Sequence, residues 1–68
     1  MKQKNAEDIK LICQEYCEEV EIDGYDVTCL VNQKYLKDLK LRVSVHGWSI
    51  QSLKKKHFLY YIRFFDFL

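Results

Sequence analysis

The sequence predicts an α+β domain in which an N-terminal amphipathic helix packs on a three-stranded antiparallel sheet, with a short helix before the last strand. Three observations predict this class: an apolar stripe with helical spacing near the N-terminus, two segments in which apolar and polar residues alternate, and an aromatic segment at residues 58–68. The chain has 68 residues and is 49% hydrophobic, so we expect one small folded domain spanning residues 1–68.

Residues 6–20 form the predicted N-terminal helix. Apolar and thiol side chains recur there at the spacing of one helical face, at Ile9, Ile12, Cys13, Tyr16, Cys17 and Val20. Asn5 suits the N-cap position, and two acidic residues follow it at the positive end of the helix dipole. The Asp23-Gly24 pair is a turn signal that could close a hairpin. Because Val20 also fits the helical face, we expect a loop that leaves the helix instead.

Two later segments predict half-buried strands. In residues 25–31, Tyr25, Val27, Cys29 and Val31 share one side of a strand. In residues 39–46, four aliphatic residues alternate with Lys40, Arg42, Ser44 and His46. The polar residues 32–38 connect the two, and one helical turn fits residues 35–39.

The last third of the chain predicts a short helix followed by a strand. Ser49 can cap a helix over residues 50–56, with Trp48 and Leu53 placed as a hydrophobic staple. Residues 58–68 hold every Phe of the chain, and this aromatic content favours a strand. A helical spacing of Leu53, His57, Tyr61 and Phe65 is the competing interpretation.

Charge is spread unevenly along the chain although the net charge is only +1. Residues 1–26 carry three Lys against eight acidic residues, a balance of −5, and residues 27–68 carry eight basic residues against two acidic ones, a balance of +6. Residues 1–8 are polar and contain no signal-peptide core, and the aromatic segment is shorter than the roughly 20 residues that cross a bilayer. We therefore expect a cytoplasmic protein that does not contact a membrane.

Neither catalysis nor a cofactor is predicted. A nucleophile needs an adjacent base, and the spacing of His46 and His57 suggests no partner acid or nucleophile for either. Cys13 and Cys17 are helical neighbours that could bind zinc together with one of these histidines. Both cysteines lie on the apolar stripe, so we predict core thiols and no metal site, with a zinc-stabilised domain as a third alternative.

A nucleic-acid-binding module is the second hypothesis. The basic candidates are Arg42, Lys54, Lys55, Lys56 and Arg63, and Tyr61 and Phe65 could stack on bases. The glycines of the RNA-recognition-motif signature are missing from residues 60–65, and the net charge is close to zero. Lysines beside an aggregation-prone strand also keep it soluble, without any ligand.

The leading hypothesis is a small non-enzymatic protein that binds and regulates or inhibits a protein partner. The last strand has apolar side chains on both sides, and one helix covers only one face of a sheet, so the other face is expected to form an interface. The predicted contact residues are Trp48, Leu59, Tyr61, Arg63, Phe65 and Phe67. We expect a homodimer, and a compact chain of this kind is typical of the accessory proteins that phages and mobile elements encode.

Overall fold

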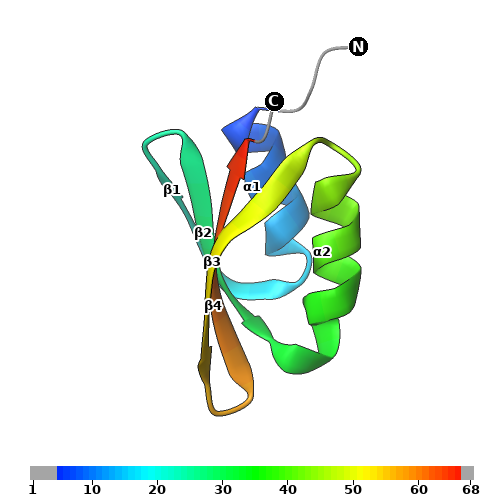
Figure 1. Ribbon diagram of the computed structural model, residues 1–68, viewed down its shortest axis with the longest axis vertical. Coiled ribbons are helices and arrows are strands. Elements are labelled where there is room, and N and C mark those ends of the chain that lie inside the picture. Colours follow the sequence, from blue (N-terminus) through cyan, green and yellow to red (C-terminus); the bar gives the residue numbers. More distant parts are fainter. Residues whose placement is uncertain (1–4, 67–68) are drawn as a thin grey trace.

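The computed structural model describes residues 5–66 and has the α+β class that the sequence predicts, with a fourth strand in the sheet. In chain order the elements are α1 (Ala6–Gln14), β1 (Cys17–Asp23), β2 (Asp26–Asn32), the 3-10 helix η1 (Gln33–Tyr35), α2 (Leu36–Ser44), β3 (Trp48–Lys56) and β4 (Leu59–Asp66). The strands form one antiparallel sheet in the order β1-β2-β4-β3, and α1 and α2 lie on the same side of it (Figure 1).

Helix α1 is shorter than predicted, and the predicted loop after it is a hairpin. The Asn5 side chain accepts a hydrogen bond from the Asp8 amide at 3.0 Å, which caps the helix, and the helix ends at Gln14. Val20 fits the helical stripe but also the two-residue period of β1, and pairing with β2 decides between them. The hairpin turn is Gly24-Tyr25, where Gly24 has a φ of 66° that glycine adopts without strain.

Strand β2 is confirmed to within one residue, whereas the predicted strand over residues 39–46 is wrong. The second segment is helix α2, which buries Leu39 and Val43 against the sheet. The predicted strand would have placed Leu41 and Val45 on that same buried side, but they are 67% and 74% exposed. The apolar residues of this segment fit both the two-residue period of a strand and the period of a helix. Leu, Lys and Arg dominate the segment, and their helix propensity decides in favour of the helix.

The predicted helix over residues 50–56 is also wrong, and the predicted final strand is confirmed over residues 59–66. Residues 48–56 form β3, which pairs with β4 and has a bulge between Ile50 and Ser52. The predicted staple does not form, because Trp48 is buried in the core while Leu53 is 46% exposed. An open edge of β4 offers backbone partners that outweigh the weak strand propensity of this segment.

The core lies between the helices and one face of the sheet. It is built from Ile9, Ile12, Cys13, Val27, Cys29, Val31, Leu39, Val43, Trp48, Ile62 and Phe64. The end of the β3–β4 hairpin extends past α2, and residues 51–58 are all exposed (Figure 1). None of the helices formed by residues 5–66 has the length and apolar character needed to cross a membrane.

Candidate binding surface on the open face of the sheet

The open face is the side of the sheet opposite α1 and α2. Its side chains alternate with the buried ones along each strand. Strand registers place Glu19, Leu30, Tyr61 and Lys54 in one row across the four strands. The neighbouring row holds Glu21, Thr28, Arg63 and Ser52. No helix of residues 5–66 packs on this side (Figure 1), so both rows lie on the outer face, although Thr28 is only 5% exposed there.

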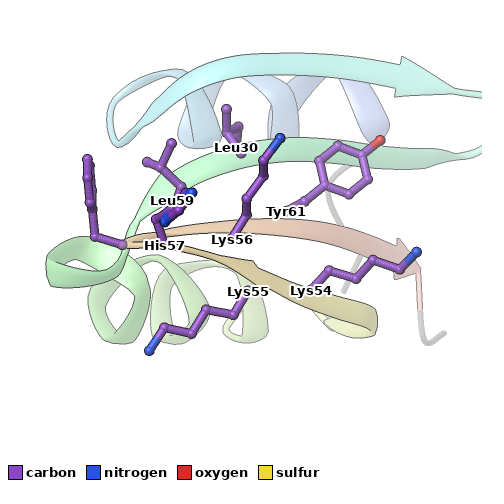
Figure 2. A pocket seen from close by; sticks show the side chains of 8 residues that line it. Leu30, Lys54, Lys55, Lys56, His57, Leu59 and Tyr61 are labelled. Atoms are coloured by element: carbon purple, nitrogen blue, oxygen red, sulfur yellow. The ribbon is translucent and has the colours of Figure 1, made fainter.

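An apolar cluster lies on the open face and extends to the turn of the β3–β4 hairpin. It consists of Leu30, Phe58, Leu59 and Tyr61, of which Tyr61 is 49% and Phe58 56% exposed. Together with Lys54, Lys55, Lys56 and His57, these residues line a hollow of about 600 Å³ (Figure 2). Exposed aromatic surface around a hollow of this kind is typical of binding sites in soluble proteins.

The two edges of the open face carry opposite charge. Glu19 and Glu21 project from edge strand β1, and Lys54 and Lys56 from edge strand β3. Lys55 points to the other side of the sheet (Figure 2), where its ammonium group lies 6.0 Å from the centre of the Tyr60 ring. The open face therefore has an acidic edge, an apolar centre and a basic edge.

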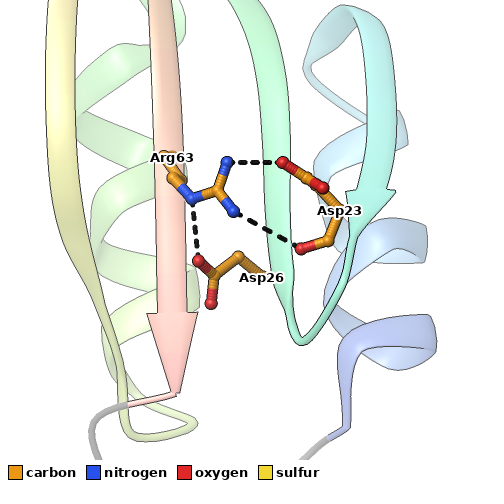
Figure 3. A network of polar contacts seen from close by, with 3 residues as sticks. All are labelled: Asp23, Asp26 and Arg63. Carbon is orange, nitrogen blue, oxygen red and sulfur yellow. Dashed lines mark hydrogen bonds and ion pairs between the residues drawn. The ribbon is translucent and has the colours of Figure 1, made fainter.

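Arg63 is engaged in a network on this face, which ties the end of the β1–β2 hairpin to β4 (Figure 3). Its Nε donates to Asp26 Oδ2 and its Nη1 to Asp23 Oδ2, each at 2.7 Å. Hydrogen bonds with Asp23 and Asp26 raise the pKa of Arg63, and the bond with Asp23 has the larger effect. The guanidinium group therefore holds the hairpin in place and has fewer donors left for a ligand.

The turn that ends the β3–β4 hairpin is strained. Lys56 pairs with Leu59, so His57 and Phe58 form a two-residue turn, and His57 has a φ of 59°. A side chain at positive φ costs about 1–2 kcal/mol relative to glycine. The equivalent first position of the β1–β2 turn is Gly24. Backbone strain of this kind tends to occur at functional positions, and this residue lines the hollow.

The structure places the predicted contact residues in different parts of the molecule. Leu59, Tyr61, Arg63 and Phe65 are on the open face, and Phe67 lies outside the described residues. Trp48 is only 2% exposed and belongs to the core, so its prediction as a contact residue is corrected.

The basic and aromatic residues do not assemble as predicted. Lys54 and Lys56 are on the open face, but Arg42 is on α2, on the opposite side of the sheet. There its Nη1 donates to Glu15 Oε1 at 2.6 Å and to the Tyr16 hydroxyl at 3.3 Å, and these contacts raise its pKa. The helical conformation of residues 36–44 is the reason for this difference.

Sequence reasoning missed Leu30, Phe58 and the acidic edge as parts of the surface. Leu30 shares the outward side of β2 with Asp26 and Thr28, and an apolar residue among polar ones was the available signal. Glu19 falls within the predicted helix over residues 6–20 and Glu21 in the loop predicted after it, because the β1 strand was not recognised.

The three cysteines form a second cluster, on the helix side of the sheet. Cys13, Cys17 and Cys29 have their sulfur atoms within 4.8 Å of one another, and all three are free. Hydrogen bonds with Cys13 and Cys29 lower the pKa of Cys17, and the bond with Cys13 has the larger effect. A hydrogen bond with Cys17 raises the pKa of Cys13. Hydrogen bonds with Cys13 and Cys17 raise the pKa of Cys29, and the bond with Cys13 has the larger effect. Neither His46 nor His57 belongs to this cluster.

Comparison of the chain with protein-family models, with curated proteins and with solved structures found no match.

Proposed function

We propose that this chain is a small interaction protein that acts by binding, and that it regulates or inhibits a protein partner through the open face. The observation that carries the proposal is the exposed apolar cluster, in which Leu30 and Tyr61 lie in one row between Glu19 at the acidic edge and Lys54 at the basic edge. Protein interfaces commonly combine an apolar centre, rich in Tyr and Phe, with a charged rim. Burial of the cluster would also add apolar contact to a domain whose own core is small.

The charge pattern of the open face favours a second copy of the chain as a partner. A two-fold axis parallel to the strands would place Glu19 of one copy opposite Lys54 of the other, and Leu30 opposite Tyr61, because the four share a row. An axis perpendicular to the strands would instead set acidic edge against acidic edge, which is unfavourable. We therefore propose a homodimer whose two-fold axis runs parallel to the strands. A different protein partner with the same charge pattern would compete with the second copy for the open face.

Light scattering over a range of protein concentrations tests the dimer. Wild-type protein should dimerise, and Tyr61→Asp should be a folded monomer because a carboxylate would be buried at the centre of the interface. Tyr25→Asp is the matched control, since Tyr25 is 92% exposed in the opposite hairpin turn, and this variant should remain dimeric. A wild-type protein that stays monomeric at high micromolar concentration would rule out this homodimer.

Charge reversal tests the symmetry of the dimer. Glu19→Lys and Lys54→Glu should each weaken the dimer, and the double variant should recover most of the lost affinity because the pair is restored with its signs exchanged. Equal weakening in the single and double variants would contradict the proposed axis.

Nucleic-acid binding at the hairpin end is the second candidate function. It is favoured by Lys54, Lys56 and His57, which line the same hollow as the Phe58 and Tyr61 rings. The acidic edge on the same face and the engagement of Arg63 by two carboxylates oppose it. Phosphate binding should weaken steeply as salt is added. Fluorescence anisotropy with single-stranded RNA and DNA, for wild type and for a variant with Gln at positions 54–56, distinguishes this function from protein binding.

A further inference from the structure

All three cysteines of the chain converge although they come from three separate elements. Cys13 is in the last turn of α1, Cys17 begins β1, and Cys29 is in the middle of β2. The sequence showed only the Cys13 and Cys17 pair, on a helix that was expected to continue past Cys17. Because that helix ends at Gln14 and β1 pairs with β2, Cys29 joins the other two.

The spacing of the sulfur atoms suits a thiophilic metal ion. Three thiolates at about 2.3 Å from one ion are about 3.8–4.0 Å from one another. The observed separations of up to 4.8 Å therefore need less than about 1 Å of closure by side-chain rotation. Cys13 and Cys29 are 0% and 2% exposed, so packing holds two of the three donors in place.

We propose that Cys13, Cys17 and Cys29 form a three-thiolate binding site for a soft metal ion, either Zn²⁺ or Cu⁺. Thiolate ligands select these ions over Mg²⁺ and Ca²⁺, which prefer oxygen. Among residues 5–66 no His, Asp or Glu belongs to the group, so Zn²⁺ would take its fourth ligand from solution, whereas Cu⁺ needs only the three sulfurs. Cys17 is only half-buried, at the edge of the sheet, and leaves a route for the ion.

Binding involves no redox change. Three thiol protons are released to solvent as three metal–sulfur bonds form, so the site with Zn²⁺ carries one negative charge and that with Cu⁺ carries two. The ion would link α1 to the β1–β2 hairpin and so stabilise the part of the core that these elements share. A purely apolar role for the thiols requires only their volume and predicts no effect of metal on the protein.

Metal titration of the reduced full chain tests the site. Co²⁺ should bind with one-to-one stoichiometry and give the intense sulfur-to-metal absorption of thiolate coordination, and Zn²⁺ should displace it. Zn²⁺ should also raise the unfolding temperature. Cys17→Ser is the main variant because the side chain is half-buried, and it should weaken Zn²⁺ binding at least tenfold while circular dichroism shows a folded protein. Cys13→Ala and Cys29→Ala should remove the absorption band, and His46→Ala and His57→Ala should keep it.

Two results would overturn the proposal. One is that Cys17→Ser binds Zn²⁺ and Cu⁺ each as tightly as wild type does. The other is that folded, reduced wild-type protein binds neither ion. A parallel titration with Cu⁺ against a chromophoric competitor separates the two ions. Binding of Cu⁺ without Zn²⁺ supports the three-coordinate form of the site, and binding of Zn²⁺ without Cu⁺ supports the form with a solvent ligand.

Discussion

The two hairpins of this sheet each have two strands and a two-residue turn, but they differ in charge, burial and the residue at the first turn position. The β1–β2 hairpin is acidic at its edge, lies close to α1, closes with a glycine and is held at its turn by Arg63. The β3–β4 hairpin is basic at its edge, closes with a strained His57, and is exposed throughout residues 51–58. Only its base, with Trp48, Ile62 and Phe64, enters the core.

If the proposed function is correct, one small sheet divides two tasks between its hairpins. Helices α1 and α2 cover one face of the sheet, and the end of the β3–β4 hairpin extends past them (Figure 1). Side chains near its base are buried in the core, whereas those near its turn are exposed and form part of the surface that we propose binds a partner. Substitutions in the two hairpins test this division.

Phe64→Ala should have the largest effect because the side chain is 1% exposed at the base of the β3–β4 hairpin. Truncation of a buried Phe costs about 3–5 kcal/mol, which is much of the stability of a domain of this size. Tyr61→Ala, on the other side of the same strand, should cost under about 1 kcal/mol. Urea denaturation of monomeric protein measures both, and equal losses would contradict the division between base and turn. If Phe64→Ala does not fold, Phe64→Leu provides a milder test.

The two hairpin turns should respond with opposite sign to substitution at their first position. Gly24→Ala should cost about 1 kcal/mol because φ is 66°, and no atom lies within 4 Å of the added methyl group to contribute a clash. His57→Gly should stabilise the protein by under about 1 kcal/mol, since relief of strain at φ 59° exceeds the added freedom of the unfolded chain. Thermal unfolding of both variants checks the signs, and destabilisation by His57→Gly would mean that its side chain makes contacts worth more than the strain.

Arg63→Ala should change the free energy of unfolding less than Phe64→Ala or the substitutions in the two turns. Loss of the bonds to Asp23 and Asp26 releases the turn of the β1–β2 hairpin and leaves two carboxylates close together without their counter-charge. Arg42→Ala is the control, because that side chain is 43% exposed and its one carboxylate partner, Glu15, is 57% exposed. Denaturation midpoints should fall further for Arg63→Ala, and the difference should shrink in high salt. A larger loss in Arg42→Ala would show that the Arg63 network does not hold the hairpin.

Sequence patterns were sufficient where one period clearly fitted best. Residues 26–32 alternate without competition and form β2, and the stripe through Ile9, Ile12 and Cys13 forms α1. Patterns failed where two periods fitted the same residues. Leu39 and Val43 are compatible with a strand or a helix, and Val20 with a helix or a strand, so a different criterion was needed in each case. For residues 36–44 that criterion was helix propensity, which the sequence contains.

The candidate binding surface was predictable in part for the same reason. The outward side of the last strand follows from alternation alone, which placed Leu59, Tyr61, Arg63 and Phe65 together. Leu30 and Glu19 could be placed beside Tyr61 only through the order and register of the strands. Arg42 and Trp48 were misplaced because their segments have a different secondary structure from the one predicted.

Local sequence patterns are sufficient to predict the α+β class, the first helix, the central strand and the apolar character of both sides of the last strand. These features depend on residues that are near one another in the chain, and local periodicity encodes them. Tertiary structure decided that residues 17–23 and 48–56 are edge strands, that the acidic and basic edges lie on opposite sides of an apolar centre, and that three thiols meet. Backbone pairing between distant segments is the reason, because a chain with weak local preferences takes the conformation that satisfies its hydrogen bonds in the sheet.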